Sequence, residues 1–128
     1  MHMAHTIINS KQAPAPIGPY SQAKLANGIL YVSGQIALDP ESGDLVNKDI
    51  ETETHQVMKN LQAILKEAGM ELEHVLKCTI FVKDLNNFGR INETYGSYFT
   101  VNPPARETVE VSRLPKDVNV EISCIATK

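Results

Sequence analysis

The stretch Asn102-Pro103-Pro104-Ala105-Arg106-Glu107-Thr108-Val109-Glu110-Val111 decides how the C-terminal half of the chain folds. Neither proline donates an amide hydrogen, and each restricts its predecessor to extended backbone, so the stretch ends any preceding helix and begins a strand. Alternation along that strand puts Arg106, Thr108 and Glu110 on one face and Glu107, Val109 and Val111 on the other. A guanidinium at a strand start can bind a carboxylate through two parallel hydrogen bonds, although from these residues alone an ordinary solvated arginine is the commoner case.

Upstream of this stretch, the nearly continuous apolar run Val75–Val82 predicts a central strand. Residues 85–99 then predict a second helix whose apolar side includes Phe88 and Tyr95. Asn92 lies between these two aromatic residues, and a polar amide beside an apolar stripe needs partners. A structural hydrogen bond and a contact with a ligand are both compatible with that position.

The N-terminal half predicts three strands and one long helix. Thr6–Ile8 is a short strand, and residues 22–26 and 29–33 form a hairpin around Asn27-Gly28, the preferred pair for a type I′ turn. Residues 49–69 follow as a helix that begins at an aspartate N-cap, repeats apolar residues with a period of 3.6 and ends at a glycine. Between the first strand and the hairpin, three prolines and a glycine exclude regular structure up to Tyr20.

The alternating residues 118–126 predict the last strand, and the element order becomes βββ-α-β-α-ββ. We therefore expect one α+β domain over residues 1–128, with a mixed sheet of about six strands and two helices on one face. The valine and isoleucine content of the strands suggests that the other face is covered by oligomerisation. Residues 1–5 are expected to be disordered or left over from expression.

Composition excludes several classes of protein. Hydrophobic residues make up 42% of the chain and charged residues 21%, as in a globular protein. The net charge of −3 and the lack of a basic block argue against nucleic-acid binding, and no apolar run is long enough to span a membrane. Without a signal-peptide pattern we expect a cytoplasmic protein. Cys78 and Cys124 have no CxxC partner and the four histidines have no ligand spacing, which predicts buried reduced thiols and no metal site.

Six segments, taken in order, resemble the RidA (YjgF) family of reactive-intermediate deaminases. They are Ala15–Gln22, Ser33–Ile36, Phe81–Leu85, Asn92–Tyr95, Pro104–Arg106 and Val109–Lys116. The likeness runs from about Thr6 to Ala126 and implies a chorismate-mutase-like fold, assembled as a homotrimer with a cleft between each pair of subunits. In these clefts the family hydrolyses small anionic 2-imino acids, such as 2-iminobutanoate and 2-iminopropanoate, to 2-keto acids and ammonia without a cofactor.

The resemblance also implies roles for individual residues. Arg106 matches the arginine that holds the substrate carboxylate, and Tyr20 matches the loop tyrosine near the attacking water. Ser33 and Gly34 match the strand-end pair that lines the cleft, and Asn92 matches the helix asparagine that reaches it. A small anionic substrate suits an arginine clamp, and an imine is electrophilic enough to need only a positioned water.

Two positions depart from the family pattern. Thr108 replaces a cysteine that is common in the deaminase branch, and we expect it to line the substrate cleft with an altered shape. Ser123 replaces the second glutamate of a Glu-Ile-Glu motif, the carboxylate expected to orient or activate the attacking water. Serine is not an effective base near neutral pH, so we expect weakened catalysis. Glu121 is an imperfect substitute, because the ordinary motif already contains it.

Three functions are compatible with this pattern. The first is a 2-imino acid deaminase, in which replacing Ser123 by glutamate raises the rate if a missing base limits it. The second is a non-catalytic regulatory trimer that binds a small carboxylate, which the serine favours. The third is a ribonuclease, an activity associated with some relatives, against which the net charge of −3 and the lack of a histidine pair argue.

Overall fold

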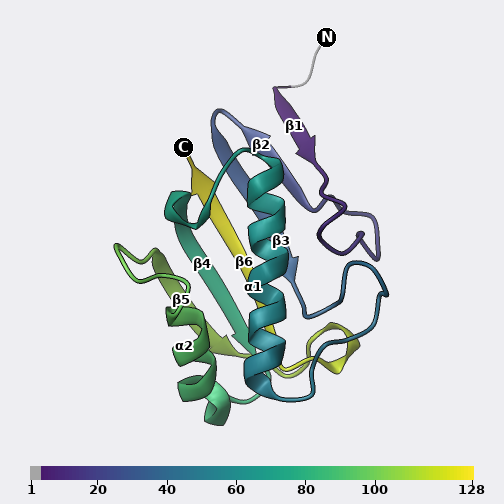
Figure 1. Ribbon diagram of the computed structural model, residues 1–128, viewed down its shortest axis with the longest axis vertical. Helices are drawn as coiled ribbons and strands as arrows, with labels where there is room; N and C mark the ends of the chain where they lie inside the picture. Colours follow the sequence, from purple (N-terminus) through teal and green to yellow (C-terminus); the bar gives the residue numbers. More distant parts are fainter. Residues whose placement is uncertain (1–3) are drawn as a thin grey trace.

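The computed structural model describes residues 4–128 as a six-stranded mixed sheet in the order β1-β2-β3-β6-β4-β5. The strands are β1 His5–Ile8, β2 Ala23–Ala26, β3 Ile29–Gln35, β4 Val75–Val82, β5 Ala105–Glu110 and β6 Val120–Thr127. The helices are α1 Ile50–Glu67 and α2 Phe88–Gly96, and both lie on one face of the sheet (Figure 1). Among the strands of residues 4–128, only β4 and β5 run parallel, and the predicted α+β architecture with a mixed sheet is confirmed.

The N-terminal half forms the hairpin turn and the helix that its local sequence predicts. Asn27 and Gly28 have φ values of 52° and 77°, as a type I′ turn requires, and they join β2 to β3. Asp49 caps α1 by accepting a hydrogen bond from the Thr52 amide at 2.7 Å. The helix ends before Gly69, whose φ of 73° places it in the left-handed region.

The second helix is shorter than predicted. The Asp84 carboxylate accepts a hydrogen bond from the Asn86 amide at 2.9 Å and holds residues 85–87 in a 3₁₀ turn, so α2 begins only at Phe88. The helix ends at Gly96, and residues 97–99 form a turn. Apolar periodicity does not distinguish the turn at residues 97–99 from helix, because Tyr98 and Phe99 still pack against the core. In the first turn, Leu85 is exposed.

The hydrophobic core lies between the sheet and α1. Its largest fully buried apolar side chains come from both layers and include Leu30, Met58, Leu61, Ile80 and Ile122. Ile80 and Ile122, at the centre of the sheet, therefore point toward the helices. The covering of the opposite face by oligomerisation stays a prediction.

That opposite face, called here the open face, mixes polar and apolar side chains. The partly or fully exposed residues on it are Tyr31, Ser33, Lys77, Thr79, Phe81, Glu107, Val109, Glu121, Ser123 and Ile125. A β-bulge interrupts this face where β3 meets β6, because Val32 pairs with Cys124 and Gln35 with Ile122, leaving Ser33 and Gly34 opposite Ser123.

Residues 1–3 lie outside the described part of the chain, and so does most of the predicted disordered segment 1–5. His5 already belongs to β1. Within residues 4–128, no helix is both long and apolar enough to cross a membrane.

Candidate functional site

Arg106 and Asn92 form the first of two clusters of predicted site residues. Arg106 Nη1 donates a hydrogen bond to Asn92 Oδ1 at 2.6 Å, and this bond joins β5 to α2. Its guanidinium carbon lies 5.2 Å from the ring centre of Tyr95 and 5.6 Å from that of Phe88. Cation–π contacts and one amide oxygen thus orient the guanidinium, which forms no ion pair with any carboxylate of residues 4–128. An oriented and uncompensated guanidinium suits an anionic ligand.

Thr108 lies two residues beyond Arg106 on the same face of β5. Its Oγ1 is buried, and no other group of the described chain forms a hydrogen bond with it. The Tyr95 hydroxyl, on α2, is also buried and has no hydrogen-bond partner among the described residues. The helix side of β5 therefore carries unused hydrogen-bonding capacity next to the arginine.

The second cluster begins with the proline-rich loop, which Gln22 holds against the sheet. The Gln22 side chain accepts a hydrogen bond from the Ser10 amide at 2.6 Å and donates to the carbonyls of Ser10 and Pro14 at 3.0 and 2.9 Å. The loop then presents Tyr20, which is 47% exposed and whose hydroxyl accepts a hydrogen bond from the Ile17 amide at 3.3 Å. The order of this loop depends on a buried glutamine that the sequence pattern did not single out.

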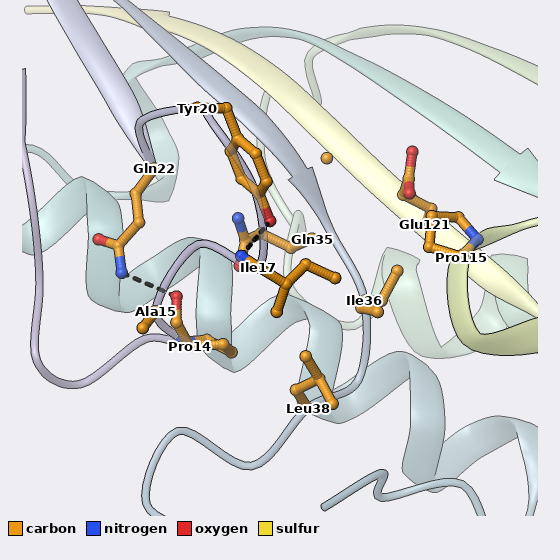
Figure 2. Close-up of a pocket in the computed structure, with 11 residues that line it drawn as sticks. Pro14, Ala15, Ile17, Tyr20, Gln22, Gln35, Ile36, Leu38, Pro115 and Glu121 are labelled. Atoms are coloured by element: carbon orange, nitrogen blue, oxygen red, sulfur yellow. Dashed lines mark hydrogen bonds between the residues drawn. The ribbon is translucent and has the colours of Figure 1, made fainter. Parts of the chain in front are cut away.

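Tyr20 lines two hollows that also contain the predicted strand-end pair. An open groove of about 580 Å³ lies between the loop and the β2–β3 hairpin and includes Tyr20 and Ser33. A smaller pocket of about 50 Å³ includes Tyr20, Gly34 and Gln35 on one side and Glu121 on the other. Figure 2 shows Tyr20 and Ile17 across this pocket from Glu121 and Pro115. The pocket has room for one or two water molecules.

Ser123 faces away from the Arg106 cluster. It pairs with Thr79 of the neighbouring strand β4, on the open face. There the Thr79 hydroxyl donates a hydrogen bond to Glu107 Oε2 at 2.6 Å. Glu107 also forms an ion pair with Lys77 at 3.2 Å. The Thr79 hydrogen bond, together with Lys77, holds the pKa of the Glu107 carboxyl below its ordinary value.

The two clusters do not meet within one chain. Arg106, on β5, pairs with Cys78 on the helix side of the sheet, whereas Ser123 and Glu121 of β6 lie on the open face. Two strands separate β5 from β3, so Arg106 lies about 14 Å from the strand of Ser33 and Gly34 at normal strand spacing. One chain thus carries two separate halves of the predicted site, the Arg106 cluster and the loop-and-pocket cluster.

Glu121 is the side chain in this region whose surroundings the sequence pattern did not predict. Its carboxylate lies over Gly34, and burial raises the pKa of the Glu121 carboxyl above its ordinary value. The contact between Glu121 and Gly34 depends on the bulge in β3 and on the absence of a side chain at Gly34. Neither feature produces a periodic pattern in the sequence. Among residues 4–128, no group of three or more histidine, cysteine or acidic side chains could hold a metal ion.

The fold and these two half-sites define a small α+β protein that presents an oriented arginine and a separate water-sized acidic pocket. The chain matches the endoribonuclease L-PSP family over residues 10–128. It is 51% identical to a RutC family protein of Pyrococcus abyssi over 98% of this chain and 99% of that one. It is 47% identical to the rat 2-iminobutanoate/2-iminopropanoate deaminase over 95% of this chain and 89% of the rat protein.

Solved structures agree with these relationships. The Yersinia pestis protein YyfA of the conserved Rid family superposes with a TM-score of 0.95 at 51% identity, covering 98% of this chain and all of that one. Escherichia coli TdcF with bound serine superposes with a TM-score of 0.92 at 37% identity, covering 96% and 98% of the two chains. The chain belongs to the endoribonuclease L-PSP family, the group that includes the RidA and YjgF proteins.

Proposed function

We propose that this protein hydrolyses small 2-imino acids, with 2-iminobutanoate and 2-iminopropanoate as the substrate class, to 2-keto acids and ammonia. The observation that carries the proposal is the Arg106 guanidinium, which is oriented by Asn92 and two aromatic rings and is left without a carboxylate partner in the described chain. A 2-imino acid supplies the missing carboxylate and places its imine carbon a fixed distance from the guanidinium. The rat relative, whose name states this activity, supports the assignment.

The arrangement of the half-sites supports a homotrimer as the active form. Arg106 and the Tyr20 pocket lie on opposite faces of one sheet, so a second copy is needed to bring them to one substrate. We propose a cleft between subunits in which one chain contributes Arg106, Asn92 and Thr108. Its neighbour contributes Tyr20, Ser33 and Gly34.

The chemistry then needs only a substrate, a water and a proton acceptor. The imine is electrophilic in its protonated form, so water adds to its carbon without a protein nucleophile. The Arg106–carboxylate contact fixes the substrate, and the loop tyrosine borders the space from which the water approaches. This division of roles needs no metal or organic cofactor.

Replacing Arg106 tests the proposal. The purified protein is added to a PLP-dependent dehydratase that generates 2-iminobutanoate, and the loss of the imine is followed. We expect Arg106→Ala to lower kcat/KM at least about 100-fold, and Arg106→Lys to be intermediate because it keeps the charge but not the paired hydrogen bonds. Arg90→Ala is the matched control, because Arg90 pairs with Glu51 outside the proposed cleft, and we expect it to leave the rate unchanged.

Two outcomes would contradict the assignment. Full activity in Arg106→Ala would remove Arg106 from the site. A wild-type protein that hydrolyses no imino acid would contradict the deaminase function, and the intact protein free of contaminating nuclease would then be tested on RNA.

A regulatory trimer that binds a small carboxylate is the second candidate. It is favoured by Ser123 at the position of the expected base, and the serine bound in the TdcF structure shows that a relative takes an amino acid ligand. Calorimetry with 2-ketobutanoate separates the two functions. Heat of binding that is lost in Arg106→Ala, with no turnover of any imino acid, supports the regulatory trimer.

A further inference from the structure

We propose that α2 opens locally from the rest of the fold, and that a carboxylate bound at Arg106 holds it closed. In the closed form α2 packs against α1 and contacts Arg106 of β5. This inference rests on the proposed carboxylate site and adds its regulation, because the ligand would complete the order of the half-site that binds it. Little stabilises α2 within the described chain, yet α2 supplies the groups that orient Arg106.

The first observation is that α2 lacks the end groups that stabilise α1. Helix α1 begins at Asp49, whose carboxylate accepts a hydrogen bond from the Thr52 amide, and it has acidic residues in its first turn and Lys66 in its last. Helix α2 has no side-chain cap at Asn87, no acidic residue in its first turn and no basic residue in its last. Neither end of α2 therefore has a charge that suits the helix dipole, and its N-terminus lacks a cap.

The second observation is the presence of two glycines among the nine residues of α2. Gly89 and Gly96 lower the stability of the helix relative to alanine, because glycine loses more backbone freedom on folding. A Cβ atom added at either position would meet nothing within 4 Å beyond its chain neighbours and the helix backbone. No packing within the described chain therefore requires these glycines, and their effect is to make α2 less stable.

The third observation is the pair of buried hydroxyls where α2 meets β5. Tyr95 of α2 is only 4% exposed, and its hydroxyl has no hydrogen-bond partner among the described residues. The Thr108 hydroxyl of β5 is also buried, and it too lacks a partner in that part of the chain. Burying a hydroxyl without a hydrogen bond destabilises the closed form, whereas opening lets water reach both groups.

The fourth observation is how few contacts hold α2 in place. Three of its nine residues are buried, whereas nine of the eighteen residues of α1 are. Arg90 pairs with Glu51 of α1, but the two side chains are 57% and 42% exposed, and exposed ion pairs contribute little. A further link is the hydrogen bond between Asn92 and Arg106, which joins α2 to an edge strand.

The same helix supplies the groups that orient the Arg106 guanidinium. Asn92 accepts its hydrogen bond, and the rings of Phe88 and Tyr95 lie 5.6 and 5.2 Å from its carbon. When α2 opens, the guanidinium loses these three contacts together. The oriented guanidinium of the closed form binds a carboxylate more tightly than a free one, so the ligand shifts the equilibrium toward closure.

Amide hydrogen exchange of the intact, assembled protein tests the opening. We expect the amides of residues 92–96 in α2 to exchange at least about 100-fold faster than those of residues 57–65 in α1. Low concentrations of urea should change the α2 rates little, because local opening exposes little surface, but should speed exchange in α1. Equal rates with equal urea dependence would overturn the inference, because α2 would then open only when the whole chain unfolds.

The coupling to ligand is tested with 2-ketobutanoate, the keto acid of the proposed reaction. At ten times its Kd, which calorimetry measures, it should slow the exchange of residues 92–96 about tenfold. Arg106→Ala should exchange faster there without ligand, because α2 loses its contacts with the guanidinium, and 2-ketobutanoate should no longer slow it. Equal slowing in Arg106→Ala would show that the coupling does not pass through Arg106 and would overturn it.

A pair of variants at Glu93 tests whether the backbone freedom of α2 sets the rate of opening. Glu93 is exposed in the middle of the helix. Glu93→Gly and Glu93→Ala remove the same side chain and differ in backbone freedom, so the exchange of residues 92–96 should be about fivefold faster in the glycine variant. Lys59→Ala, an exposed change in α1, is the control and should leave the α2 rates unchanged. Equal rates in the two Glu93 variants would overturn local opening of α2.

Tyr95→Phe tests the contribution of the buried hydroxyls. It removes the unpaired hydroxyl and keeps a ring beside Arg106, so the exchange of residues 92–96 should slow at least about fivefold. Faster exchange in Tyr95→Phe would show that the hydroxyl stabilises the closed form, which would contradict the third observation.

The outcomes distinguish this inference from the proposed function. A protein that hydrolyses imino acids but whose α2 exchange does not respond to 2-ketobutanoate overturns the inference and leaves the deaminase function standing. Slowed exchange without turnover of any imino acid supports the inference and contradicts the deaminase function. A protein that neither binds 2-ketobutanoate nor hydrolyses an imino acid overturns both.

Discussion

Thr108 carries a hydroxyl that is buried beside Arg106 and has no hydrogen-bond partner among the described residues. Leaving a buried hydroxyl unsatisfied costs about 1–3 kcal/mol. The cysteine that the family resemblance places here would impose a smaller penalty, because a thiol forms only weak hydrogen bonds. The Thr108 hydroxyl then either only destabilises the fold or forms its hydrogen bond with a bound ligand.

Thr108→Val distinguishes these two possibilities. We expect its free energy of unfolding to rise by about 1 kcal/mol, because the orphaned hydroxyl is removed at nearly constant volume. We also expect its KM for imino acid to rise, because the cleft loses a hydrogen-bonding group. Urea unfolding and the imine-loss assay measure the two effects. An unchanged KM would remove Thr108 from the substrate cleft.

Sequence reasoning reached some of these residues and not others. Alternation along residues 106–111 is enough to put Arg106 and Thr108 on one face, and the structure confirms it. The partner of Asn92 could not be deduced, because the β5–α2 contact depends on how two elements pack. The contact between Glu121 and Gly34 could not be deduced either, because a bulge changes which residues face each other without changing the sequence period.

At the scale of elements, α1 and β6 are joined by a buried carboxylate. Glu53 is fully buried, and its oxygens accept hydrogen bonds from the Asn119 amide and side chain, both at 2.8 Å, and from the Val120 amide at 3.3 Å. These bonds fix the start of β6, the strand that carries Glu121 and Ser123. The place of Glu53 in the first turn of α1, where the helix dipole favours acidic residues, does not by itself reveal these contacts.

Glu53→Gln should lower the free energy of unfolding by about 2 kcal/mol, because the amide replaces one acceptor by a donor that faces N–H groups. The measurement is urea unfolding at neutral pH. Glu51→Gln, an exposed change in the same turn, is the control and should have a clearly smaller effect. Equal effects of the two changes would show that the Glu53 contacts do not stabilise β6.

Element prediction succeeded where a residue has one strong local preference. The Asn27-Gly28 turn and the cap at Asp49 formed as expected, since each backbone conformation suits few other residues. The second helix was predicted too long, because a 3₁₀ turn before Phe88 and a turn after Gly96 continue the same apolar pattern. Local sequence does not encode how tightly such a turn winds.

At the scale of the molecule, the sheet exposes one mixed face and divides the predicted site in two. The sequence order of the strands does not reveal this division, because β3 and β5 become separated only when β6 inserts next to β3. Family resemblance alone suggested clefts between subunits. The opposite faces of Arg106 and Ser123 support the proposed cleft between two subunits.

The central claim is that one substrate lies between Arg106 of one chain and the Tyr20 pocket of another. Subunit mixing tests it most directly, using Arg106→Ala and Tyr20→Ala chains that are co-expressed in equal amounts. The mixed protein should have a light-scattering mass three times the 14.1 kDa of the chain. Random assembly should restore about a quarter of the wild-type imine hydrolysis, because one cleft in four receives both intact half-sites. Activity no greater than the average of the two variants measured separately would contradict the shared cleft.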